Sequence, residues 1–192
     1  MRWTQSAMRE VAQEERGGLG LRTTDPFDPY ALAEAHGISV YTLASLREFG
    51  VGSTALMHFT VDNTSAWSAA LVPLGTSRVI VENEGHALVR RRSNIAHELG
   101  HHLLEHPFDH VILGEDHKRQ FNDQQEKEAK YMAELLVPLA AAERMAYDGW
   151  DNAQVAAACG VSKQFAQMQM KGQRIWALRA AKRYGFQAPS MH

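Results

Sequence analysis

The chain has 192 residues, a formal net charge of −2 and 45% hydrophobic residues. This length and apolar content predict a folded domain with a small appendage and argue against a disordered or fibrous chain. The only cysteine, Cys159, excludes an internal disulfide, so we expect a reducing, cytoplasmic compartment. The first sixteen residues lack a signal-peptide core, and the longest uncharged apolar run, 135–142, is too short to span a bilayer. We therefore expect no membrane association.

Helix and strand signals in the first half of the chain predict an α+β fold. Residues 1–16 are expected to form an amphipathic helix, which a glycine-rich joint at 17–20 follows. Asp28 and Pro29 have the pattern of a helix start, and Gly37 marks the end of that helix. Because the connections among the later strands are short, we expect a small antiparallel sheet. Four strands are predicted, at 38–43, 53–60, 66–73 and 77–82, and the short connections are those among the last three.

The second half of the chain is predicted to be helical. One helix is expected over about 86–106, and a second begins near Glu126 after a loop of about fifteen residues. Pro138 is expected to end the second helix and to start another that runs to Tyr147.

A metal-binding motif lies in the helix predicted at 86–106. His97 and His101 are four residues apart, so they stand on one helix face and can bind one metal ion. Glu98 lies beside them and can hold and deprotonate a metal-bound water, which completes the minimal set for hydrolysis of a peptide bond. A glycine inside a helix, as at Gly100, lowers stability by about 1 kcal/mol relative to alanine. Its presence is explained if another part of the structure must pack closely against the helix at this position.

A catalytic zinc requires a third protein ligand. Four nearby histidines are interpreted as solvated or packing residues, because their spacing or their polar-loop position does not suit the pair: His102, His106, His110 and His117. Glu128 borders the apolar stripe of the following helix, where a carboxylate is unfavourable unless it binds a cation. Glu126 projects farther from that stripe. We therefore predict Glu128 as the third ligand and keep Glu126 as the alternative.

The two helical motifs resemble the ImmA/IrrE family of zinc metallopeptidases. The similar segments are H-E-L-G-H-H-L-L-E-H at 97–106 and E-K-E-A-K-Y-M-A-E-L-L-V-P at 126–138, and the likeness extends over about 25–185. Five positions depart from the family pattern without touching a predicted ligand: Ser93, Asn94, Lys130, Met132 and Val137.

The resemblance implies a zincin-like fold with one zinc ion, or another divalent ion, per chain. It implies metal ligands at His97, His101 and Glu128, with Glu98 as the general base. On this basis we divide the chain into an N-terminal helix and linker, a metallopeptidase domain and a helical C-terminal region, at 1–20, 21–147 and 148–192.

The family also implies a narrow protein substrate, a helix-turn-helix transcriptional repressor that is cleaved to derepress stress-response or mobile-element genes. Two alternatives are open. The protein could be a non-catalytic, metal-stabilised antirepressor or regulator that binds a partner or DNA. It could instead be a toxin-like peptidase that an adjacent antitoxin restrains.

The C-terminal region is basic, because no acidic residue follows Asp151. Residues 152–171 also have the spacing of a helix-turn-helix, so nucleic acid binding is a hypothesis, with Lys163, Gln164 and Gln167 as its candidate residues. We favour the alternative that this region packs on the rest of the protein. Its expected buried face consists of Phe165, Met168, Ile175, Trp176 and Leu178.

Overall fold

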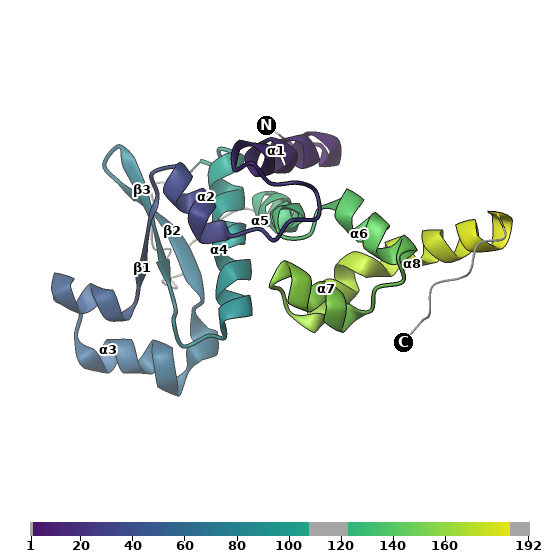
Figure 1. Cartoon of the computed structure of the whole chain (residues 1–192). Helices are drawn as coiled ribbons and strands as arrows, with labels where there is room; N and C mark the ends of the chain where they lie inside the picture. Colours follow the sequence, from purple (N-terminus) through teal and green to yellow (C-terminus); the bar gives the residue numbers. More distant parts are fainter. Residues whose placement is uncertain (1, 108–122, 185–192) are drawn as a thin grey trace. The chain divides into compact units, whose positions relative to one another are not determined.

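The computed structural model describes residues 2–107 and 123–184, which form two compact units (Figure 1). The first unit comprises the residues up to Val11 together with Asp28–Ala133, and the second comprises Ala12–Phe27 and the residues from Glu134 onward. The start of the chain is thus grouped with the H-E-x-x-H helix. His110, His117 and the predicted loop around them lie outside the described residues. Within the described ranges, no helix combines the length and apolarity needed to cross a membrane.

The first two helices follow their sequence signals. Helix α1 covers Gln5–Gly18, and helix α2 covers Pro29–Ala35 with proline at its first position. The Asp28 carboxylate accepts the backbone N–H of Tyr30 at 3.1 Å and caps α2. Gly37 has a φ angle of +66°, a left-handed conformation that glycine adopts at little cost, and it ends this segment as predicted.

The sheet has three strands in the order β1-β3-β2 (Figure 1). These are β1 at Ser39–Thr42, β2 at Ala69–Leu74 and β3 at Ser77–Glu82. Strand β2 pairs antiparallel with β3, but β1 pairs parallel with β3, so the sheet is mixed. The prediction of an antiparallel sheet is therefore wrong for one of the two pairs. A long helical connection between β1 and β2 lets β1 lie beside β3 in the same direction.

The predicted strand at 53–60 is also wrong, because that segment is helical. A 3-10 helix at Ala44–Phe49 leads into α3 at Ser53–Met57, and a π-helical turn at His58–Asp62 follows. A second short 3-10 turn covers Thr64–Ala66 before β2 begins. Only one side chain of α3, Leu56, is buried. A short run with so few buried positions has no distinct helix or strand period, so its pattern could not separate the two.

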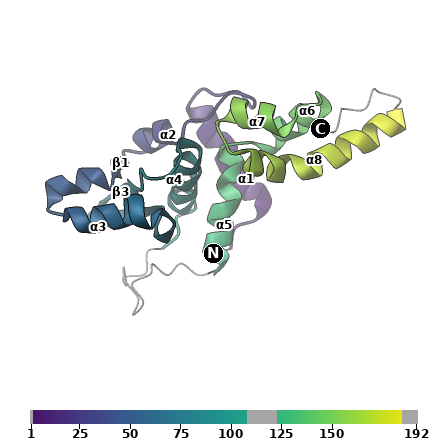
Figure 2. The same cartoon turned by 90° about the horizontal axis from the view of Figure 1, so that it is seen from below.

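Helix α4, Leu88–Leu103, packs on the sheet and beside α2 (Figures 1 and 2). Ile95 and Leu99 of α4 are fully buried, as are Leu71 of β2 and Ile80 of β3. Burial of each such side chain contributes about 1.5–3 kcal/mol, so this contact fixes the helix that carries the H-E-x-x-H motif.

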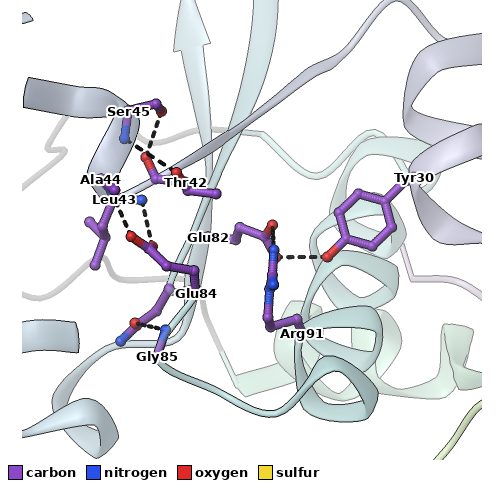
Figure 3. A network of polar contacts seen from close by, with 10 residues as sticks. Tyr30, Thr42, Leu43, Ala44, Ser45, Glu82, Glu84, Gly85 and Arg91 are labelled. Carbon is purple, nitrogen blue, oxygen red and sulfur yellow. Dashed lines mark hydrogen bonds and ion pairs between the residues drawn. The ribbon is translucent and has the colours of Figure 1, made fainter. Parts of the chain in front are cut away.

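A buried polar network anchors the start of α4 to the end of β3 (Figure 3). Arg91 binds both carboxylate oxygens of Glu82, through Nε at 3.0 Å and Nη2 at 2.5 Å. The hydroxyl of Tyr30 donates to the same carboxylate at 2.9 Å. Burial and this hydrogen bond raise the pKa of Tyr30 to about 12. Glu82 is 2% exposed, so its charge depends on these two partners.

The second unit contains α6 at Leu139–Tyr147, α7 at Asn152–Cys159 and α8 at Lys163–Tyr184. Helix α6 begins directly after Pro138, as predicted. A capping box formed by Asp151 and Gln154 starts α7.

The predicted buried face of α8 is wrong in register. The buried side chains are Ala166, Met170, Ala177 and Ala181, whereas Met168, Ile175 and Trp176 are 52%, 45% and 62% exposed. Alanines allow α6 and α7 to pack closely on α8, so the small side chains face inward. The other two members of the predicted face, Phe165 and Leu178, are partly buried.

Candidate metal centre

Helix α5, Asp123–Tyr131, packs against α4 at the H-E-x-x-H motif (Figure 1). The contact is close at Gly100. A Cβ atom added there would lie 3.0 Å from the carbonyl oxygen of Ala129 and 3.0 Å from Cβ of Met132. The close approach that would explain a glycine in this helix is therefore present, and α5 is the element that approaches.

This contact brings three metal-binding side chains together: His97, His101 and Glu126. The Nε2 atoms of the two histidines are 3.2 Å apart. In the Glu126 carboxylate, Oε2 lies 3.2 Å from Nε2 of His97 and Oε1 lies 3.5 Å from Nε2 of His101. Ligand atoms about 2.1 Å from a tetrahedral zinc are about 3.4 Å from one another. The three side chains fit one such ion.

The group is buried on one side and open on the other. The His101 side chain is 1% exposed, whereas those of His97 and Glu126 are 31% and 47% exposed. Structural zinc sites are closed by four protein ligands, but a catalytic site keeps one position for water or substrate. Three ligands with an accessible side match the catalytic kind.

Glu98 lies at the edge strand of the sheet. Its Oε2 accepts the backbone N–H of Leu71, in β2, at 2.7 Å. The residue is 7% exposed, so this bond holds the carboxylate in a largely dry environment beside the turn that carries both histidines. This placement suits the predicted general base, which must be positioned next to the reacting groups.

Glu128, the predicted third ligand, lies outside the group of three side chains. Its Oε1 accepts hydrogen bonds from the Trp3 backbone N–H at 3.1 Å and from Nε2 of Gln124 at 2.7 Å, and its Oε2 lies 3.1 Å from Nε2 of His106. Glu128 is 2% exposed, as its position beside the apolar stripe suggested. Burial raises the pKa of Glu128, but these hydrogen bonds outweigh that effect and the net shift is downward. The carboxylate is therefore ionised and satisfied by donors.

His106 occupies a position that sequence reasoning missed. Its Nδ1 lies 2.9 Å from Nδ1 of His101, and the residue is 4% exposed. Burial lowers the pKa of His106, with the hydrogen bond to Glu128 opposing the shift, so the imidazole is neutral. A helix that continued to residue 106, as the sequence predicts, would place His106 on the far side from the histidine pair. The helix ends at Leu103, however, and the chain turns back toward His101. By contrast, His102 points away from the group as expected, with its Nδ1 2.7 Å from Nη1 of Arg78.

Most of the chain matches a known protein family. The family model of the IrrE N-terminal-like domain matches residues 33–171. The chain belongs to the ImmA/IrrE family of peptidases. The matched range contains the motif on α4 and both glutamates of α5, and the family suggests a metallopeptidase-type function. None of the curated proteins compared with the chain matches it.

A second candidate surface lies on α7 and α8, inside the second unit. Gly160, with a φ angle of +63°, separates the two helices as expected for a helix-turn-helix. The three residues considered for DNA contacts, Lys163, Gln164 and Gln167, are exposed on the first turns of α8. They are therefore accessible, but so is the apolar side chain of Met168 among them.

Proposed function

We propose that this member of the ImmA/IrrE family is a zinc-dependent endopeptidase whose metal ligands are His97, His101 and Glu126. The observation that carries the proposal is the spacing of the three ligand atoms, 3.2–3.5 Å, which suits one tetrahedral ion. In this proposal Glu126 takes the ligand role that sequence reasoning gave to Glu128, and the fold is of the zincin type. The donor set of two imidazoles and a carboxylate also accepts other divalent ions.

The reaction we propose is hydrolysis of a peptide bond with Glu98 as the general base. A bound zinc ion would polarise the scissile carbonyl and lower the pKa of a coordinated water. The Glu98 carboxylate removes a proton from the attacking water and then delivers it to the nitrogen of the leaving amine. The N–H of Leu71 keeps Oε2 of Glu98 in place during both transfers.

We propose that the substrate binds in extended form along the outer edge of β2. The N–H of Leu71 points away from β3, toward Glu98, and Pro73 is two residues farther on the same edge. Proline lacks an N–H and is confined in sheets to such edge positions. Among the described residues no strand pairs with this edge. The N–H of Leu71 is taken by Glu98 and Pro73 has none, so the peptide we propose adds to this edge by donating its own N–H groups to the outward carbonyls of Leu71 and Pro73.

The substrate we propose is a helix-turn-helix repressor, on the strength of the family resemblance.

The first test of the proposed function is metal binding, measured by competition with a chromophoric chelator. His97→Ala, His101→Ala and Glu126→Gln should each lose zinc, whereas Glu98→Gln should retain it. A wild-type protein that takes up no zinc would refute the proposed centre.

The second test is cleavage of a helix-turn-helix protein encoded beside this gene, followed by mass spectrometry. The wild type should cut it at a defined bond, and zinc-loaded Glu98→Gln should be slower by several orders of magnitude because an amide cannot accept the water's proton. Equal cleavage by both proteins would indicate a contaminating protease. Tight binding without cleavage would favour the antirepressor alternative. If the wild type shifts the mobility of duplex DNA and the double variant Lys163→Glu/Lys171→Glu does not, the DNA-binding regulator is favoured.

A further inference from the structure

A chain of buried polar groups runs from His101 into the interior of the first unit, through His106 to Glu128. We propose that His106 and Glu128 are positioning residues that hold His101 as a neutral ligand with Nε2 directed at the metal. This inference rests on the proposed metal centre. It gives Glu128 a role that differs from metal ligation.

The backbone at the end of α4 places His106 beside His101. The N–H of His106 donates to the carbonyl of His101 at 3.0 Å, and the N–H of Glu105 donates to that of His102 at 3.1 Å. Glu105 has a φ angle of +51°, so these bonds form a Schellman motif with a left-handed residue after the helix. In this motif the second residue beyond the helix commonly makes an apolar contact with the residue five positions earlier. Here both of these positions hold histidines, and their rings are in polar contact.

The distances, together with a metal bound to Nε2 of His101, assign a proton to one nitrogen of each ring. The Nδ1 atoms of His101 and His106 are 2.9 Å apart, so one must donate and the other accept. If Nε2 of His101 binds a metal, its neutral ring carries the proton on Nδ1 and is the donor. The Nδ1 of His106 then accepts, and its protonated Nε2 donates to Oε2 of Glu128 at 3.1 Å. One arrangement of protons thus satisfies every ring nitrogen in the chain.

Glu128 is held firmly enough to serve as the fixed end of this chain. Besides His106, it accepts from Gln124 and from the backbone of Trp3, so three donors from separate segments converge on one carboxylate. The indole Nε1 of Trp3 also donates to the carbonyl of Leu104, at 3.0 Å, in the turn that presents His106. His101, His106 and Glu128 are 0%, 4% and 2% exposed, so water does not compete for these bonds.

A purely structural role would make a different prediction from a positioning role. If the chain only filled the core, its loss would lower stability but leave the zinc affinity of the folded protein unchanged. Partners that orient a ligating histidine fix its tautomer and raise its basicity, and their loss weakens metal affinity about 10–100-fold. Zinc affinity therefore distinguishes the two roles, provided that each variant is folded.

The experiment compares His106→Leu, His106→Gln and Glu128→Gln with wild type in the full chain. Circular dichroism first confirms folding of each metal-free protein, and zinc dissociation constants are then measured by chelator competition at one pH. We expect His106→Leu and Glu128→Gln to bind zinc about 10–100-fold more weakly. His106→Gln should recover part of the loss, because its amide can both accept and donate. Nitrogen-15 spectra of the zinc-loaded wild type should show the His101 proton on Nδ1.

Two variants act as matched controls. Glu105→Gln removes an exposed carboxylate from the same turn, and His102→Leu removes a histidine that bonds to Arg78 instead of the cluster. Both should bind zinc within twofold of wild type.

The outcomes separate this inference from the proposed function. Zinc affinities of His106→Leu and Glu128→Gln within twofold of wild type, with zinc lost in Glu126→Gln, would overturn the positioning role and leave the metal centre standing. Loss of zinc in Glu128→Gln with retention in Glu126→Gln would identify Glu128 as a ligand and would also overturn the positioning role. A wild type without zinc affinity would overturn both proposals.

Discussion

Replacement of Gly100 by alanine tests the packing that brings Glu126 to the two histidines. An alanine in a helix interior is normally favoured over glycine by about 1 kcal/mol. At Gly100, however, the new methyl would lie 3.0 Å from the carbonyl oxygen of Ala129 and 3.2 Å from its Cα. These atoms belong to the backbone of α5, so relief requires movement of the whole helix. Overpacking of this kind costs about 1–3 kcal/mol. We expect a net loss of about 0–2 kcal/mol in the free energy of unfolding.

The same shift should weaken zinc binding, because Glu126 is one turn from Ala129 on α5. Gly172 is a matched control: it lies inside α8, and an added Cβ there would meet nothing within 4 Å. Gly172→Ala should therefore stabilise by up to about 1 kcal/mol and leave zinc affinity unchanged. Urea unfolding of the metal-free proteins and chelator competition measure both effects. The reasoning would fail if Gly100→Ala stabilised the protein as much as Gly172→Ala and bound zinc as tightly as wild type.

Two further predictions concern buried ionisable groups. Arg91→Ala should lower the free energy of unfolding by about 3–5 kcal/mol because it leaves the Glu82 carboxylate buried without a cation. Tyr30→Phe should lower it by about 1–2 kcal/mol, because it removes one hydrogen bond to the same carboxylate. Equal urea midpoints for Arg91→Ala and wild type would contradict the first expectation. The pKa of His106 is lowered from 6.5 by burial, so the unfolded chain binds its proton first, and the metal-free protein should lose stability as pH falls below about 6.5. The pKa of Glu128 is lowered from 4.5 because its donors outweigh burial, so a second loss should follow as pH falls below about 4.5. Urea titrations in steps from pH 7.5 to about pH 3 measure these losses, and in His106→Leu the first one should be smaller.

The elements with local chemical signals could be predicted from the sequence. The elements concerned are the Asp28 cap with its following proline, Gly37 and the β-branched run of β3, each of which specifies a conformation through nearby atoms alone. The direction of β1 relative to β3 could not be predicted in this way, because it depends on the path of the connection between them. The helix at Ser53–Met57 was missed for a related reason, since five residues with one buried side chain show no clear period.

The third ligand that we propose, Glu126, shows a different limit. Sequence reasoning identified Glu128 as a buried carboxylate that needs a partner, and the structure does bury it and provide partners. The inference that this partner is a metal assumed that a ligand carboxylate belongs on the buried side of its helix. A catalytic ion has to be reached by water and substrate, so at least one of its ligands can lie at the open side of the site. Glu126 is there, 47% exposed, with its oxygens 3.2 and 3.5 Å from the two histidine nitrogens.

In the proposed centre the two carboxylates of α5 have different roles because they lie at different depths. Residues two apart on a helix point in directions about 160° apart, so Glu126 and Glu128 cannot both face the same ion. Glu126 faces the accessible side of the histidine pair, whereas Glu128 faces inward and meets His106 behind His101. In the proposed centre one contacts the metal directly and the other acts through two imidazoles. A charge-neutral Gln at position 126 should accordingly abolish zinc binding, while Gln at position 128 should only weaken it. The ratio of the zinc dissociation constants of Glu128→Gln and wild type measures how far His106 and Glu128 support His101 as a ligand.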